Sequence, residues 1–150
     1  MKRTKLLLLL LSLTTSLGFG EQNPKKNGEF CWNELATSDL QKAKDFYGKV
    51  FGWEFVEKKM GETTYTMIKV NGKDNGGMWA IPKDKQQEIP PHWMSYILVE
   101  NIEASLEKAK KNGATVLKPI TTLEDAGKFA IITDPTGAHI ALWQSLNKPN

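Results

Sequence analysis

The sequence predicts an α+β protein built from two copies of one unit, in which a strand and a helix are followed by three strands. The first observation is a weak internal repeat, because the segment 38–55 matches the segment 100–116 at an offset of about 62 residues. The second is hydrophobic periodicity, which places one amphipathic helical pattern among strand patterns in each copy. The third is the placement of Gly, Pro and Asn between these patterns. Together they predict one domain over 29–145.

The first unit, 29–82, begins with a strand pattern over 30–37 and continues into a helix. Ser38 and Asp39 are suitable N-cap residues, and Gly52 is a suitable C-terminal stop. The residues expected on the buried stripe of the helix are Leu40, Ala43, Phe46, Tyr47 and Val50. The three strands expected after the helix cover 53–59, 63–70 and 76–81.

The second unit, 92–145, repeats this order after a polar, proline-bounded linker over 83–91. Its first strand is predicted over 92–100. Asn101 then caps a helix that Asn112 and Gly113 end. The inner face of that helix is expected to carry Ile102, Leu106 and Ala109. The last three strands are predicted over 115–119, 128–133 and 138–144, with a proline turn before the final one.

The N-terminal residues 1–20 have the pattern of a secretory signal peptide. Basic residues precede an apolar run over 6–11, and a small-residue site follows at 18–20. The run is too short for a permanent membrane span. We therefore expect an exported protein, periplasmic or secreted, with 21–28 as a flexible lead-in. An uncleaved N-terminal anchor is the alternative.

The net charge of +3 comes entirely from Lys2, Arg3 and Lys5, because 1–20 contains no acidic residue. The remaining chain has 17 Lys against 17 acidic residues and no Arg. A neutral balance argues against nucleic acid as a partner. The lack of Arg argues against ligands with several anionic groups, since Arg is the usual bidentate partner of carboxylate and phosphate.

Cys31 is the only cysteine, so an exported chain can form no internal disulfide. It is predicted to be a small, buried apolar residue at a strand start. An intermolecular disulfide and a reactive thiol are the alternatives.

Two segments resemble a known family. The segment 39–53 reads D-L-x-K-A-x-x-F-Y-x-x-x-F-G-W, and 134–144 reads D-P-x-G-A-x-x-A-L-W-Q. With the repeated unit, they resemble the vicinal oxygen chelate superfamily, which includes glyoxalases, bleomycin resistance proteins and extradiol dioxygenases. The segments 30–35 and 91–93 resemble its uncharacterised glyoxalase-like branch. The resemblance implies one cupped mixed sheet that holds a small-molecule pocket.

Metal-dependent members of that family carry His or Glu on the first and last strand of each unit. The resemblance and strand alternation place these four slots at Trp32, Met78 or Trp79, Met94 and Ala141. These side chains do not suit divalent metals, which bind carboxylate, imidazole or thiolate. No cofactor is therefore expected. The alternative is a displaced divalent-metal site formed by Glu34, His92 and His139. Alternation also places these three residues on the concave face of the predicted sheet, the cup face.

The cup face is instead predicted to bind a flat apolar ligand. The residues expected to contact it are Trp32, Met94, Tyr96, His139 and Trp143, with Met78 beside them. Trp93 is expected to face the helix and to join the core. The alternative is that these side chains fill the cup and leave no pocket. Tyr96 is either a hydrogen-bond donor to the ligand or a half-buried strand aromatic.

Glu34 is the candidate catalytic residue, as a general base. The alternative is a solvated or Lys-paired acid at the mouth of the cup. His92 is either a binding residue or a turn residue after two prolines, Pro90 and Pro91.

Three functions remain open. The first is a metal-free binder of a small apolar or aromatic ligand, for which the resemblance to antibiotic-sequestering members implies a homodimer. The second is a metal-dependent lyase or dioxygenase-type enzyme. The third is a purely structural or interaction module.

Overall fold

The computed structural model describes residues 24–60, 63–123 and 126–146. The expected signal peptide over 1–20 lies outside them, so cleavage and export stay predictions. In the described part of the chain, no helix is long and apolar enough to cross a membrane.

Each unit has the predicted order of one strand, one helix and three strands. The first unit contains β1 (Phe30–Thr37), α1 (Leu40–Phe51), β2 (Glu54–Met60), β3 (Thr63–Val70) and β4 (Lys73–Ala80). The second contains β5 (His92–Leu98), α2 (Ile102–Lys111), β6 (Thr115–Leu123), β7 (Gly127–Thr133) and β8 (His139–Ser145). A short 3₁₀ turn, η1 (Lys83–Lys85), lies in the linker between them.

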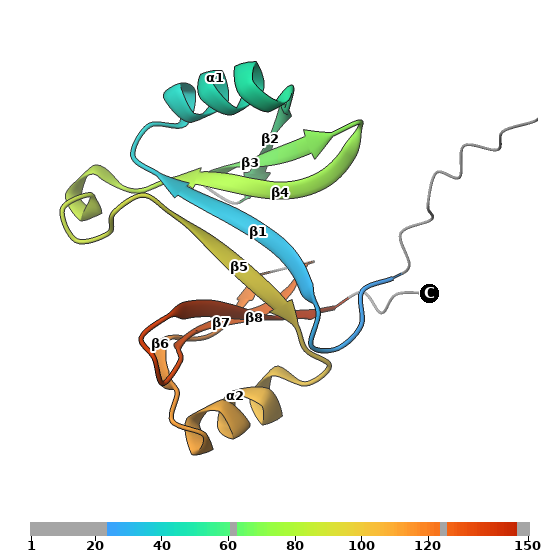
Figure 1. The fold of residues 1–150 in the computed structure, drawn as a ribbon, viewed down its shortest axis with the longest axis vertical. Coiled ribbons are helices and arrows are strands. Elements are labelled where there is room, and N and C mark those ends of the chain that lie inside the picture. The colour runs from blue at the N-terminus through green and yellow to red at the C-terminus, as the bar shows by residue number, and fades with distance from the viewer. Residues whose placement is uncertain (1–23, 61–62, 124–125, 147–150) are drawn as a thin grey trace, which may run out of the picture.

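The two units join into one mixed sheet with the strand order β2-β3-β4-β1-β5-β8-β7-β6. The first strands of the units, β1 and β5, are antiparallel neighbours at the centre. Each pairs in parallel with the last strand of its own unit, β4 or β8. Figure 1 shows α1 and α2 at opposite ends of the molecule, with β1 and β5 crossing between them. The predicted cupped sheet of two βαβββ units is confirmed.

The helix ends follow the predicted capping residues. The side chain of Asp39 accepts a hydrogen bond from the backbone N–H of Lys42 at 3.0 Å. Asn101 accepts one from Ala104 at 2.8 Å, a contact that typically stabilises a helix by about 1 kcal/mol. The chain leaves the helices through Gly52 at φ 67° and Gly113 at φ 91°, a backbone region that favours glycine.

One face of the sheet packs against the helices and forms two cores. The core under α1 contains Leu35, Ala43, Ile68 and Met78. The core under α2 contains Val99, Ile102, Leu106, Ala130, Ile132 and Leu142. Alternation along each strand then directs the intervening residues to the opposite, concave face, which we call the cup face.

The structure corrects three expectations about which side chains line the cup and which are buried under α1. Met78 does not line the cup but lies fully buried under α1, so the family slot at the end of the first unit falls on Trp79. Phe46 and Val50 are 56% and 54% exposed, because α1 contacts the sheet along a stripe narrower than its apolar face. Trp93 faces α1 as expected, but it is 41% exposed and lies at the rim of the core.

The strand β6 extends four residues beyond its predicted end at Pro119. Pro lacks an N–H and normally ends a strand, yet it is tolerated at bulges and on edge strands. Here β6 is the edge of the sheet, and its pairing with β7 shifts on both sides of Lys118. The bulges therefore accommodate Pro119 without ending the ladder.

Candidate functional site

The cup face is assembled mainly from the four central strands. Between β1 and β5, Trp32 pairs with Tyr96 and Glu34 pairs with Met94, so all four side chains share one face. Ala141 of β8 lies beside Tyr96. The expected placement of these residues by strand alternation therefore agrees with the register of the sheet.

Glu34 lies at the centre of a hydrogen-bond network made of aromatic side chains. Its Oε1 accepts from Trp79 Nε1 at 3.0 Å and from the Tyr96 hydroxyl at 3.0 Å. Its Oε2 accepts from the Tyr65 hydroxyl at 2.7 Å. Trp32 Nε1 donates in turn to the Tyr65 oxygen at 3.0 Å. Among the described residues no Lys pairs with Glu34, and aromatic N–H and O–H groups hold its carboxylate instead.

The two tyrosines remain protonated donors to this carboxylate. Burial raises the pKa of Tyr65, and the negative charge of Glu34 raises it further. Burial and the same charge raise the pKa of Tyr96. Ionisation of either phenol would leave two negative charges in contact, so the network is stable with one charge only, on Glu34.

Two glycines give the aromatic rings of the cup face room to cross the sheet. Gly77 lies opposite Glu34 on β4, and a Cβ there would overlap the ring and hydroxyl of Tyr65. Gly127 on β7 lies under Trp143, and a Cβ there would be 2.3 Å from the backbone oxygen of Gln144 and 2.7 Å from Cζ2 of the indole. Gly in a strand often marks such a close approach.

The part of the cup next to Glu34 is apolar. Met94, Tyr96 and Ala141 are less than a tenth exposed and form its centre. The residues packed around them are Cys31, Trp32, Phe129, Ile131 and Trp143. The Tyr96 and Phe129 ring centroids are 6.5 Å apart. Lys118 Nζ lies 5.6 Å from the Phe129 centroid, over the side of the cup formed by β7.

Cys31 contacts this cluster because β1 has a bulge at its start. The pairing with β5 moves from Phe30–Ile97 to Trp32–Tyr96, which leaves Cys31 as the extra residue. Its thiol lies 3.5 Å from the backbone oxygen of Tyr96. Burial raises the pKa of the thiol, which is typical of a structural cysteine rather than a reactive one.

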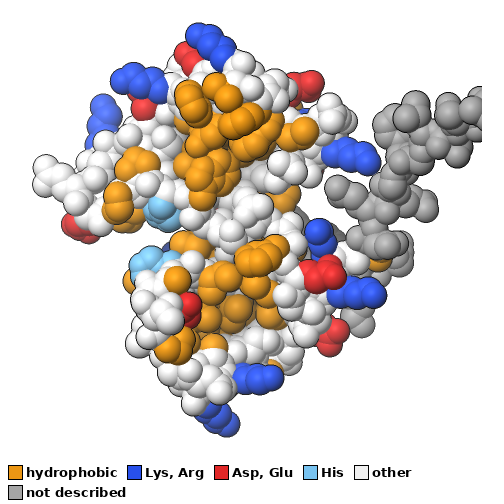
Figure 2. All heavy atoms as spheres, in the orientation of Figure 1, with side chains coloured by type: hydrophobic (Ala, Val, Ile, Leu, Met, Phe, Trp, Pro, Cys, Tyr) orange, Lys and Arg blue, Asp and Glu red, His pale blue; other side chains and the backbone are white. Residues whose placement is uncertain are grey.

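The two histidines do not join Glu34. Figure 2 shows both of them on one face of the molecule. His92 makes a hydrogen bond through Nδ1 to Pro90 O at 2.8 Å, and His139 through Nδ1 to the Thr133 hydroxyl at 2.9 Å. His139 is exposed at the start of β8.

The residues present do not fit a divalent metal at the family positions. Trp32 and Trp79 offer only N–H donors, and Met94 and Ala141 offer no nitrogen or oxygen ligand. Within 24–60, 63–123 and 126–146, no group of three or more His, Cys, Asp and Glu is arranged to hold a metal ion. The side chains at these four positions therefore do not support a metal-dependent reaction in the cup.

Tyr65 and Gly77 are the site residues that sequence reasoning missed, and Trp79 was expected only as one of two candidates for a family slot, not as a partner of Glu34. The signal was present in the alternation of β3 and β4, since Thr66 pairs with Met78 on the helix side and leaves Tyr65 and Trp79 on the cup face. The Gly76-Gly77 pair inside a strand was a second signal of close approach.

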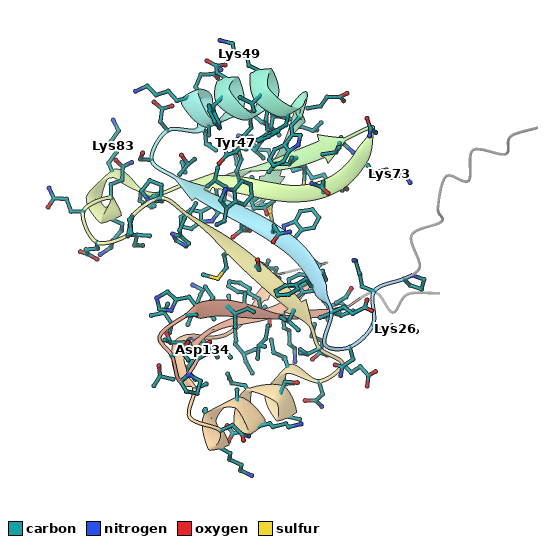
Figure 3. The ribbon with its side chains drawn as sticks, viewed as in Figure 1. Lys26, Tyr47, Lys49, Lys73, Lys83 and Asp134 are labelled. Carbon is teal, nitrogen blue, oxygen red and sulfur yellow. The ribbon has the colours of Figure 1, made fainter. Side chains whose placement is uncertain are left out.

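The opposite face carries a separate aromatic cluster around α1. Tyr47 stacks on Trp53 at 5.2 Å and accepts a hydrogen bond from Trp93 Nε1 at 3.1 Å. Figure 3 shows Tyr47 between α1 and the sheet, and Figure 2 shows hydrophobic side chains gathered there. A hollow of about 290 Å³ beside them is lined by Asn33, Trp53, Ile68, Asn75, Gly76 and Trp93. This hollow lies outside the cup.

A family model described as the Glyoxalase/Bleomycin resistance protein/Dioxygenase superfamily matches residues 31–142. Among curated proteins, "Putative glyoxylase CFP32" of Mycobacterium tuberculosis is 35% identical over 116 residues, which are 76% of this chain and 44% of that protein. The anthracycline biosynthesis protein DnrV of Streptomyces peucetius is 25% identical, over 78% of this chain and 47% of that protein. The chain spans less than half the length of these relatives.

Solved structures share the fold. Methylmalonyl-CoA epimerase from Mycobacterium tuberculosis matches with a TM-score of 0.60 at 16% identity, over 84% of this chain and 95% of that one. The hypothetical protein BH1468 from Bacillus halodurans matches with a TM-score of 0.62 at 11% identity, over 83% and 99%.

Proposed function

Because the chain belongs to the Glyoxalase/Bleomycin resistance protein/Dioxygenase superfamily, we propose that it binds a small apolar or aromatic ligand in the cup without a catalytic metal. One observation carries the proposal. The polar atoms of Trp32, Tyr65, Trp79 and Tyr96 all point into the Glu34 network, so the rings present apolar surface to the cup. Apolar lining with a few placed polar groups is typical of small-molecule sites.

The relatives are consistent with this ligand class. The name of DnrV connects it with an anthracycline, which has a flat polycyclic body. Such a body would stack on Trp143 or Trp32, where aromatic contacts add to the burial of apolar area. The proposed ligand is therefore planar and mainly apolar.

Isothermal titration with the neutral probe 1-naphthalenemethanol tests the proposal in two matched variants. Trp143→Phe removes an indole from the cup, and Trp93→Phe removes one from the α1 face. We expect weaker probe binding in Trp143→Phe and unchanged binding in Trp93→Phe. Unchanged probe binding both in Trp143→Phe and in a Trp32→Phe variant would place the probe outside the cup.

An enzyme is the second candidate, and the position of Glu34 in the cup favours it. A carboxylate beside a bound ligand could exchange a proton with it, as a glyoxalase-type reaction requires, and a relative at 35% identity has "glyoxylase" in its name. Elemental analysis of protein purified without chelators tests the metal-dependent form of this candidate. A stoichiometric transition metal that is lost in Glu34→Ala or His139→Ala would favour the enzyme.

Export and a homodimer are further parts of the proposal. The N-terminal pattern over 1–20 supports export, which N-terminal sequencing of the protein from a secreted or periplasmic fraction would test. The exposed Phe46, Val50 and Phe51 on α1 support self-association, because a second copy would remove them from water.

A further inference from the structure

Glu34 is a negative charge that has no cationic partner among the residues the structure describes. The ion pairs found among the described residues all involve other carboxylates. Its three hydrogen-bond donors, Tyr65, Trp79 and Tyr96, are neutral groups. They solvate the carboxylate without cancelling its charge, so a negative potential remains at the centre of the cup.

The carboxylate also has one acceptor position to which no described residue donates. Two carboxylate oxygens offer about four lone-pair sites. Oε1 accepts two hydrogen bonds and Oε2 accepts one, from Tyr65. Among the described residues, one site on Oε2 therefore has no donor, and Glu34 is partly exposed. A ligand N–H would complete the set.

The surrounding rings favour the same charge. The N–H edges of Trp32 and Trp79 and the hydroxyls of Tyr65 and Tyr96 are used within the network. The ring faces carry negative electrostatic potential and attract cations, most strongly in Trp. Lys118, whose Nζ lies over the Phe129 ring, shows that a cation already occupies one such position on the cup face.

We infer that the cup selects an organic ammonium cation with a flat apolar body, whose N–H donates to Oε2 of Glu34 while the body contacts the aromatic rings. This inference rests on the proposed function and adds the charge of the ligand to it. A neutral ligand of the same shape could donate only an uncharged hydrogen bond and would leave the charge of Glu34 uncompensated, and an anion would meet that charge directly.

Three naphthalene probes of similar shape test the inference on the purified full chain by isothermal titration. They are 1-naphthylmethylamine, a cation at neutral pH, 1-naphthalenemethanol, which is neutral, and 1-naphthoate, an anion. We expect the amine to bind about tenfold or more tightly than the alcohol, as one charge-assisted hydrogen bond would give, and the anion to bind least. The advantage of the amine should shrink with added salt.

The variant Glu34→Gln keeps the size and an acceptor oxygen but removes the charge. We expect it to bind amine and alcohol within about twofold of each other. Glu57→Gln, which neutralises a carboxylate on the α1 side, is the matched control and should keep the preference. Tyr65→Phe should also keep it, because it removes a donor from Oε2 and leaves the charge.

The outcomes separate the two proposals. Equal binding of alcohol and amine to the wild-type protein would overturn the cation inference and leave the proposed apolar site standing, and this comparison needs no variant. A parallel loss of both probes in Glu34→Gln and Tyr65→Phe would also overturn it, because Glu34 would then act only by positioning the rings. If none of the three probes binds, the proposed function fails for flat ligands, and the inference fails with it.

Discussion

The ring of Tyr65 occupies the space above Gly77 in which any other residue would place its Cβ. Tyr65 belongs to β3 and its hydrogen-bond acceptor Glu34 belongs to β1, with β4 between them. The phenol must therefore cross β4, and it can do so only over a residue without a side chain. Gly77 is required here for space and not for an unusual backbone angle.

Replacing Gly77 by Ala should detach Tyr65 from Glu34. The obstructing atoms are at the end of a side chain, so Tyr65 can move aside and the fold should persist. The Tyr65–Glu34 and Trp32–Tyr65 hydrogen bonds would be lost. We expect the free energy of unfolding to fall by about 1–3 kcal/mol, measured by urea denaturation, with a changed Trp emission in the folded state.

Gly48→Ala is the matched control for this change. Gly48 lies inside α1, and a Cβ there would make ordinary contacts at 3.4 Å and 3.5 Å with Phe55 and Trp53. Because Ala is the better helix former, Gly48→Ala should be neutral or stabilising by up to about 1 kcal/mol. A Gly77→Ala variant as stable as Gly48→Ala would show that the Tyr65 contact contributes little.

The fold could be predicted from the sequence largely because its signals are local. Helical spacing, the caps Asp39 and Asn101, and the glycines Gly52 and Gly113 depend only on neighbouring residues. The cup residues Trp32, Tyr96 and Trp143 followed from alternation and a family pattern. Alternation could place Tyr65 and Trp79 on the cup face, but it could not show that they reach Glu34, because that depends on the register between β1, β3 and β4.

Alkaline pH should destabilise the protein through Tyr65 and Tyr96. Their pKa values are raised in the folded state by burial and by Glu34, so above about pH 10 the unfolded chain loses phenol protons that the folded chain keeps. The tyrosines therefore make their full contribution to the free energy of unfolding below that pH. Above it, the free energy of unfolding falls by up to about 1.4 kcal/mol per pH unit for each tyrosine. Urea unfolding across alkaline pH measures the slope.

The variant Tyr65→Phe/Tyr96→Phe separates this effect from general alkaline unfolding. It should start from a lower free energy of unfolding, since the hydrogen bonds to Glu34 are gone, but it should lose less stability per pH unit. The phenolate absorbance of the wild-type protein should show a late step that coincides with unfolding and is missing in the variant. Equal slopes for the two proteins would contradict the assignment.

Thr66 carries a buried hydroxyl that has no hydrogen-bond partner among the described residues. It is fully buried on the helix side of β3, opposite Met78. An unpaired buried hydroxyl is costly, and Val has nearly the same shape without it. We expect Thr66→Val to raise the free energy of unfolding by about 1 kcal/mol, measured by thermal and urea denaturation.

Thr37 provides the comparison, because it is also a buried strand threonine but its hydroxyl is bonded to the backbone N–H of Asp39 at 3.3 Å. Thr37→Val leaves that N–H without its acceptor and should lower stability by about 1 kcal/mol. Opposite signs for the two variants are expected. A destabilised Thr66→Val protein would indicate that its hydroxyl is satisfied in solution.

The exposed apolar side of α1 leads to a prediction about self-association. Phe46 and Phe51 are 56% and 57% exposed and contact the ring of Tyr47. Figure 3 shows Lys49 on the side of α1 away from the sheet. A stable interface typically buries about 800 Å² on each partner. Sedimentation equilibrium should give a dimer for the wild-type protein and a monomer for Phe46→Lys/Phe51→Lys.

The control variant Lys49→Gln, on the same helix, should remain dimeric. A monomeric wild-type protein at micromolar concentration would remove α1 as the interface, and a dimeric double-Lys variant would place the interface elsewhere.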